Sequence, residues 1–332
     1  MNKIFCFGEL LLRLSPQLNG EWLQGASMPV YLGGAELNVA TALANWNVPV
    51  KYCTVLPDNY LSEDIKQTLQ KKGINTSAIH TAGNRIGTYY LPQGADLKSA
   101  GVIYDRAHSS FSELQPGVIN WNTVLEDCNG FHFTAISPAI NENVAAVCKE
   151  ALEAATAKGL TISVDLNYRS KLWQYGKQPV EVMPELVRYA HVVMGNMWAA
   201  EQLLGISSPI KESTGHSQKE LVTAAEQSME QLKQAYPNAA TIAYTFRLEK
   251  EYFALLHRNG NTEVSRKFLL NNIVDKAGSG DCFMAALLHG LREQHNDREV
   301  INFAAAAAVG KMQEKGDATA QTIGAIQKIL NR

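Results

Sequence analysis

The feature that most constrains the fold of this chain is a regular alternation of short apolar runs and longer amphipathic runs. The apolar runs are rich in β-branched residues and cover residues 130–136, 159–167, 191–196, 239–246 and about 251–257. The runs between them predict helices at about 142–157, from near 182, from 197 and at about 216–235. Strands that alternate with helices build a parallel sheet covered on both faces. The sequence therefore predicts a three-layer α/β/α fold with a mainly parallel central sheet.

The N-terminal part continues this pattern. Residues 3–8 and 50–56 have the composition of strands, and residues 61–72 predict a helix that ends at Gly73. Between the two strands, Gly33 and Gly34 open an amphipathic helix, which carries Asn38 in its first turns. A glycine pair at this position lets a ligand approach the backbone closely.

Two regions do not fit the alternation, because glycine and proline interrupt their apolar runs. Residues 9–32 suit short hairpin strands, and residues 85–111 contain two strands joined by a glycine-containing loop. We predict that they form a small β-sheet lid over the functional site. The remaining residues, 1–8, 33–84 and 112–332, would form the core domain.

Composition and charge exclude several classes of protein. Thirty basic and thirty-two acidic residues give a formal charge of −2, so the chain has no basic footprint for nucleic acid. Glu9 and Arg13 interrupt the first apolar run, unlike a signal peptide, and no uncharged segment reaches the roughly 18 residues of a membrane span. The cysteines show no paired spacing and the histidines no metal-ligand spacing. We expect a cytoplasmic protein, and no metal-ligating residue is identified.

Residues 271–291, with the sequence NNIVDKAGSGDCFMAALLHGL, carry the strongest local signal for chemistry. A β-branched pair precedes a polar turn with Gly278 and Gly280, followed by Asp281 and a helix-forming run, which predicts strand, turn and helix. Unpaired backbone amides at such a turn bind anions, and the carboxylate of Asp281 is placed to accept a proton. The alternative is that Asp281 only caps the helix.

Further polar residues fall at the ends of predicted strands, where ligands bind in open parallel sheets. They are Gly33 and Gly34 with Asn38, Asp165 and Asn167 with Arg169, Asn196, the segment from Asp275 to Asp281, and Arg106 at the end of a lid strand. Glycines, arginines, an asparagine and an acid together favour a polar, anionic, hydroxyl-rich ligand.

Two of these segments resemble the signatures of the ribokinase-like (PfkB) carbohydrate kinases. GGAELNVATALANW is similar to the N-terminal signature, and DKAGSGDCFMAALLHGL is similar to the C-terminal one. The resemblance implies that Asp281 is the catalytic base for a sugar hydroxyl. It also implies that the backbone amides around Ala277, Gly278, Ser279 and Gly280 form an anion hole for the transferring phosphoryl group. Family members use ATP with Mg²⁺ or a similar divalent ion.

Within that family, VIYDRAHSS and DLNYRSKLW resemble segments of the 2-keto-3-deoxygluconate kinases. Guanidinium groups suit the carboxylate of a sugar acid, because they stay charged and donate paired hydrogen bonds. The resemblance implies phosphorylation of 2-keto-3-deoxygluconate to its 6-phosphate. The implied substrate-binding residues are Gly33, Gly34, Asn38, Tyr90, Arg106 and Arg169, together with Asp281. An alternative role for Arg169 is a structural ion pair with Asp165.

The nucleotide site departs from the family pattern at two places. The family usually has the motif Asn-x-x-Glu, but in this chain Asn196 is followed at that spacing by Ala199, and the next glutamate, Glu201, is displaced. The second departure is the loop at 244–251, which contains no glycine. Arg247 of that loop is a candidate nucleotide contact. Small side chains in the alanine run at 304–310 would leave room for a flat base. The implied nucleotide-binding residues are Asn196, Arg247, Gly278, Gly280, Ala305 and Ala308.

Three other functions stay open at this point. The chain could be a fructokinase or another sugar kinase of this fold, or a catalytically weak sugar-binding regulatory protein. A dinucleotide-dependent oxidoreductase is disfavoured, because the first strand runs into FGELLLRL without the Gly-x-Gly-x-x-Gly turn. A small sheet with an apolar face is unstable alone, and family lids commonly build dimers. We therefore predict a homodimer or higher homo-oligomer through the lid.

Overall fold

The computed structural model describes residues 2–17, 25, 27–93 and 101–331, and its core is one large sheet. Within these residues the sheet has ten strands in the order β15-β14-β13-β12-β11-β10-β1-β4-β6, with β16 beside β14. Their bounds are β1 (Lys3–Phe7), β4 (Val50–Cys53), β6 (Ile74–Asn75), β10 (Cys128–Thr134), β11 (Thr161–Asp165), β12 (Val192–Gly195), β13 (Thr241–Arg247), β14 (Glu251–Arg258), β15 (Asn261–Val264) and β16 (Phe268–Leu269). Neighbouring strands from β13 to β6 are parallel, whereas β14 pairs antiparallel with β13, β15 and β16.

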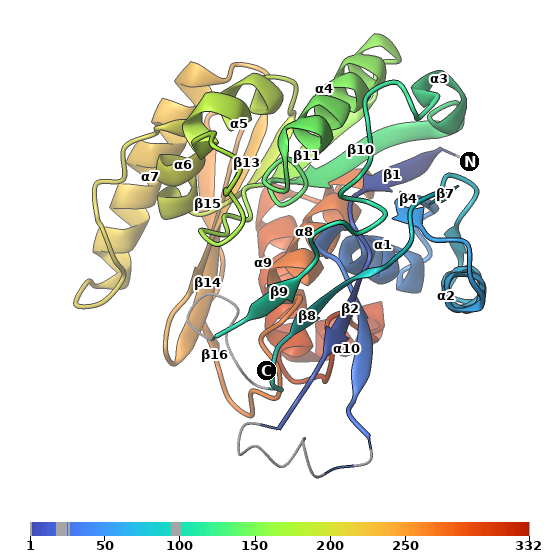
Figure 1. The fold of residues 1–332 in the computed structure, drawn as a ribbon. Helices are drawn as coiled ribbons and strands as arrows, with labels where there is room; N and C mark the ends of the chain where they lie inside the picture. The colour runs from blue at the N-terminus through green and yellow to red at the C-terminus, as the bar shows by residue number, and fades with distance from the viewer. Residues whose placement is uncertain (1, 18–24, 26, 94–100, 332) are drawn as a thin grey trace.

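Helices cover both faces of this sheet, as the alternation predicts (Figure 1). One face carries α1 (Ala35–Asn45), α2 (Tyr60–Lys71), α8 (Ser279–Arg292), α9 (Asp297–Lys311) and α10 (Ile323–Leu330). The other carries α3 (Trp121–Val124), α4 (Glu142–Ala157), α5 (Pro179–Val187), α6 (Met197–Leu204) and α7 (Gln218–Ala235). Each face has its own apolar core, so the central strands are buried on both sides. The prediction of a three-layer α/β fold is confirmed.

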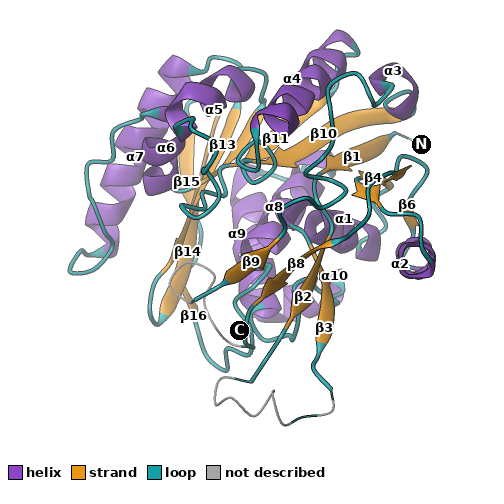
Figure 2. Ribbon diagram, viewed as in Figure 1, coloured by secondary structure: helices purple, strands orange, loops and turns teal. Residues whose placement is uncertain are grey.

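A separate four-stranded sheet forms the predicted lid (Figure 2). Its strands are β3 (Val30–Gly33), β2 (Leu11–Leu14), β8 (Gly87–Tyr90) and β9 (Ile103–Asp105), in that order. β8 and β9 are antiparallel, as expected of a hairpin, and β2 joins the two halves by pairing parallel with β8. Parts of the predicted lid, 18–24, 26 and 94–100, lie outside the described residues. A further pair, β5 (Val55–Leu56) and β7 (His80–Thr81), lies beside the core.

One predicted element is wrong. The β-branched pair before the glycine turn does not form a strand, because its backbone bonds to the end of α9 instead of to a sheet. The amides of Val274 and Asp275 both donate to the carbonyl of Met312, at 2.8 and 3.1 Å. The turn is therefore held by the segment that follows α9.

Candidate active site

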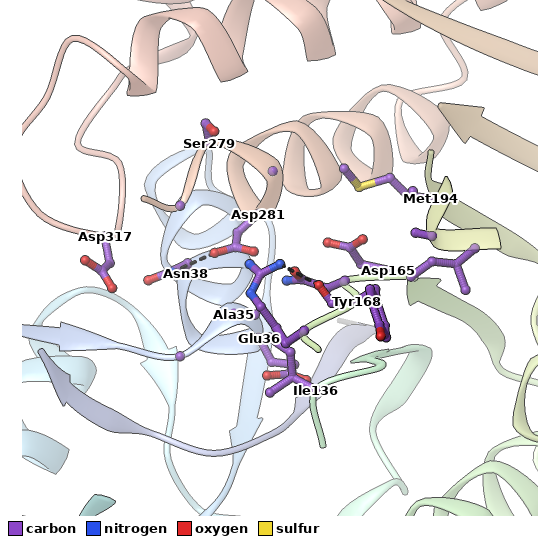
Figure 3. Close-up of a pocket in the computed structure, with 18 of the residues that line it drawn as sticks. Ala35, Glu36, Asn38, Ile136, Asp165, Tyr168, Met194, Ser279, Asp281 and Asp317 are labelled. Carbon is purple, nitrogen blue, oxygen red and sulfur yellow. Dashed lines mark hydrogen bonds between the residues drawn. The ribbon is translucent and has the colours of Figure 1, made fainter. Parts of the chain in front are cut away.

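A cavity of about 570 Å³ lies between the lid and the carboxyl ends of β11, β12 and β13. Asp165, Gly195 and Arg247, the last residues of those strands, line it together with the N-terminus of α8. The lid contributes Tyr89 and Tyr104. The large sheet, the lid and α8 thus enclose one site, as expected for an open parallel sheet (Figure 3).

The glycine turn before α8 has the geometry of an anion site. Gly278 precedes the helix with φ 74°, and an added Cβ would lie 1.7 Å from the carbonyl oxygen of Asp317. Gly278, Ser279 and Gly280 line the cavity, and the first amides of a helix such as α8 have no intrahelical acceptor. Ala277 does not line the cavity, and its amide donates to Asp275 Oδ1 at 3.1 Å, whereas Ser279 lines the cavity and its amide makes only a long bond of 3.4 Å to the carbonyl of Lys276. Of the four residues predicted to form the anion hole, only residues 278–280 line the cavity.

Asp281 lies in the first turn of α8, with 8% of its surface exposed. Its Oδ2 accepts a hydrogen bond of 2.7 Å from Asn38 Nδ2 on α1, and the two side chains face each other in Figure 3. Burial raises the pKa of Asp281 to about 6, although the Asn38 bond and the charge of Arg169 both act to lower it. The hydrogen bond between Asp281 and Asn38 thus joins α8 to α1 at the cavity wall, and the pKa of this carboxyl lies nearer to neutral pH than that of an ordinary aspartate.

The two arginines predicted to bind substrate have different surroundings. Arg106 is buried and already paired, since its Nε and Nη2 both donate to Glu9 Oε2, the former at 2.8 Å. Ser109 donates to the other oxygen of Glu9. Arg169 is half-buried, and its Nη1 donates to the carbonyl of Tyr168 at 3.1 Å. Both arginines line the cavity, and Glu9, the ion-pair partner of Arg106, lines it as well.

Three predicted residues lie away from the cavity surface. Side chains alternate across β8, and Tyr89 lines the cavity while Tyr90 lies on the opposite face of the lid. Ala305 and Ala308 are fully buried in α9, which packs against α8 and β14. Their small side chains allow close helix packing and do not line this cavity.

Of the two neighbouring glycines Gly33 and Gly34, only one lines the cavity. Gly34 lines the cavity, whereas Gly33 lies behind it, where an added Cβ would lie 2.9 Å from Asp317 Oδ2 and 3.0 Å from the hydroxyl of Tyr89. Gly33 is therefore needed for packing between the lid and the segment after α9.

At the other end of the cavity, Asn196 caps α6 by accepting a bond of 2.9 Å from the amide of Ala199. The glycine-free segment is a tight hairpin between β13 and β14, in which Arg247 pairs with Tyr252. Nη1 of Arg247 lies 3.5 Å from Ser279 Oγ, so this arginine reaches the anion hole. Glu201 pairs instead with Lys211, away from the cavity.

Several cavity residues were missed by the sequence analysis. They are Glu9, Glu36, Tyr89 and Asp317, all buried and all lining the cavity. Glu36 accepts bonds from the amide and hydroxyl of Thr134 at 2.9 and 2.8 Å, and burial raises its pKa to about 7. Its place inside the GGAELN motif was a usable signal. Tyr89 was identifiable only with the register of β8.

Other site types receive no support from the described part of the chain. Those residues contain no group of three or more histidine, cysteine and acidic side chains that could hold a metal ion. The five cysteines are free thiols. None of the described helices has the length and apolar character needed to cross a membrane.

Comparison with known proteins identifies the family. The model for "pfkB family carbohydrate kinase" matches residues 1–323. A 2-dehydro-3-deoxygalactonokinase of Haloferax volcanii is 27% identical over 99% of this chain and 96% of its own, and a 2-dehydro-3-deoxygluconokinase of Bacillus subtilis is 24% identical over 94% and 90%. The crystal structure of a Thermotoga maritima 2-dehydro-3-deoxygluconokinase is 33% identical, covers 100% of both chains and superposes with a TM-score of 0.89. The chain therefore belongs to the pfkB family of ATP-binding, ribokinase-like carbohydrate kinases.

Proposed function

We propose that this kinase transfers the γ-phosphoryl group of ATP to the terminal hydroxyl of 2-keto-3-deoxygluconate, giving the 6-phosphate. The family establishes a sugar kinase, and relatives named as kinases of 2-keto-3-deoxy sugar acids support a substrate of that class. The single observation that carries the mechanism is the buried Asp281, which faces Asn38 beside the amides of the anion-hole turn.

In this mechanism Asp281 removes the proton of the attacking hydroxyl as the O–P bond forms and the bond to ADP breaks. The amides of Gly278, Ser279 and Gly280 stabilise the charge on the transferring group. Asn38 orients the carboxylate through its 2.7 Å bond. Magnesium is usually held by one or two carboxylates and the substrate phosphates. Asp165, a buried acid on the cavity wall, fits that need, and Mg²⁺ would supply charge neutralisation at the phosphates.

We assign recognition of the substrate carboxylate to Arg169 and orientation of the sugar to Arg106. Arg169 faces the cavity near Asp281, and its charge acts on that carboxylate. Arg106 is neutralised by Glu9, so the pair presents donors and an acceptor suited to hydroxyl groups. This division supports a ligand that has both a carboxylate and several hydroxyls.

The test is turnover of Mg·ATP with a panel of 2-keto-3-deoxygluconate, 2-keto-3-deoxygalactonate, fructose and ribose. We expect the keto-deoxy acids to have the highest kcat/KM, with phosphate on the terminal hydroxyl by NMR. Fast turnover of fructose without turnover of either acid would contradict the substrate proposal.

The galactonate epimer is a second candidate, because the Haloferax volcanii relative acts on it by name. The two acids differ only in the orientation of one hydroxyl group. Their kcat/KM ratio, measured with the same enzyme preparation, decides between them: a value above one for gluconate supports the first proposal, and a value below one supports the second.

We also propose a dimer through the outer face of the lid. Val30 and Ile103 are 54% and 62% exposed there, and Leu14 and Tyr90 lie in the same row of the sheet. An apolar row of this kind needs a partner surface. Light scattering should give the mass of a dimer or larger assembly, and Ile103→Asp should lower it. A monomer of the unmodified protein would refute the proposal.

A further inference from the structure

A buried group of charges links the lid to the anion-hole turn. Arg13, on lid strand β2, is 0% exposed, and its Nη1 lies 2.8 Å from Asp275 Oδ2 and 2.7 Å from Asp317 Oδ1. Its Nε donates to the carbonyl of Leu91 at 3.1 Å. Lys311 is also fully buried, and its charge acts on both carboxylates. Arg13 is thus the cation that pairs directly with both acids inside the protein.

Asp317 contacts both parts of the site. Its Oδ1 accepts from Arg13, and its Oδ2 accepts from the hydroxyl of Tyr89 on lid strand β8. Its main-chain carbonyl packs against Gly278, so closely that an added Cβ would lie 1.7 Å from the oxygen. One residue thus receives donors from two lid strands and fixes the position of the first glycine in the anion hole.

The lid side of this link forms part of the cavity wall. Tyr89 lines the cavity, and its ring lies 6.4 Å from that of Tyr104, which also lines it. A sugar that contacts Tyr89 therefore contacts the residue whose hydroxyl holds Asp317. An ion pair with a purely structural role would not need a donor from the cavity wall.

We propose that Asp317 is a positioning residue that makes the geometry of the anion hole depend on the seating of the lid. With Arg13 and Tyr89 bound, Asp317 holds Gly278 in the left-handed conformation that directs the amides of residues 278–280 at the phosphoryl group. When either donor is lost, the turn relaxes and the transition state loses stabilisation. The inference rests on the proposed kinase mechanism and adds to it the residue that connects its two ends.

The kinetic test uses Tyr89→Phe and Asp317→Asn, with Tyr90→Phe as the matched control on the outer face of the same strand. We expect kcat to fall about tenfold in the first two variants, with KM for the sugar acid changed by less than about threefold. The double variant should lose little more than either single one, because both changes break one link. Additive losses, or a kcat equal to wild type in Tyr89→Phe, would overturn the inference.

A second measurement does not depend on turnover and separates this inference from the proposed function. Hydrogen exchange of the amides of residues 278–281 in the ligand-free protein should be faster in Tyr89→Phe and Asp317→Asn than in wild type or Tyr90→Phe. Unchanged exchange in folded variants would sink the inference even if the wild type is an active kinase. Faster exchange would support it even if the wild type turned over none of the sugars tested.

Discussion

The two ends of the cavity are built in different ways. At the sugar end, charged side chains are buried and already paired, as in Arg106 with Glu9. At the proposed nucleotide end, the side chain of Asn196 is already engaged as the cap of α6, and Nη1 of Arg247 lies 3.5 Å from Ser279 Oγ. The sugar end is therefore preorganised by side-chain ion pairs, whereas the nucleotide end depends on helix termini and a hairpin. We expect the first arrangement to give specificity for one ligand shape and the second to bind phosphate in general.

The largest effect is expected at Asp281, where the two ends meet. Asp281→Asn should lower kcat by about 10²–10⁴-fold while sugar binding, measured by calorimetry, stays within about threefold. The raised pKa means that ionising this buried carboxyl destabilises the fold as pH rises from 3.8 towards about 6. The variant should therefore melt at a higher temperature than wild type at pH 8. Retained turnover would remove Asp281 from the mechanism.

Arg169 and Arg106 test the sugar end directly. Arg169→Ala should raise KM for the sugar acid about 10–100-fold with little change in melting temperature, because it removes a charged hydrogen bond from a half-buried site. Arg106→Ala should instead lower stability by about 3–5 kcal/mol, since it leaves the buried Glu9 unpaired.

The pairing of Arg106 with Glu9 makes Arg106→Ala a poor test for a neutral sugar as substrate. Loss of activity in Arg106→Ala alone is not diagnostic, because Glu9 is left without its partner. Arg106→Gln combined with Glu9→Gln keeps a neutral hydrogen-bonding pair and is the matched control. If Arg169→Ala left KM unchanged for every sugar acid, the assignment of the carboxylate site to this end would be wrong.

The pH dependence offers a finer comparison of the ends. Because Asp281 must be ionised to act as a base and burial raises its pKa to about 6, kcat/KM should fall about tenfold per pH unit below that value. Arg169→Gln removes a charge that lowers this pKa, so the acidic limb should move to higher pH. Arg247→Gln, at the other end, should leave the limb in place. A flat profile between pH 5 and 8 would contradict a base with this pKa.

The smallest effect is expected at the nucleotide end. Arg247→Ala should raise KM for ATP by about fivefold to tenfold and leave KM for the sugar unchanged, because it removes one half-buried cation from an anion site that amides already supply. Steady-state kinetics with each substrate varied in turn provides the measurement. A loss of kcat comparable to that of Asp281→Asn would show that the two ends are not separable.

Local signals in the sequence were enough for much of this protein. Alternating β-branched and amphipathic runs predicted the layers of the fold. A strand that is buried on both faces is apolar along its length, and a helix that is buried on one face has apolar residues at helical spacing, so both can be recognised in the sequence. The turn from Gly278 to Asp281 was identified because glycine geometry and an acid at a helix start are local requirements.

Tertiary structure alone decided which side chains meet. Tyr89 rather than Tyr90 faces the cavity because a strand's register fixes the face of every residue, and this register is set by distant β2 and β9. The pairing of Arg106 with Glu9, and of Arg13 with Asp317, joins residues far apart in the chain. The periodicity of apolar residues in the sequence indicates which residues are buried. It does not indicate which buried charged side chains form ion pairs, because the partners are brought together only by the tertiary fold.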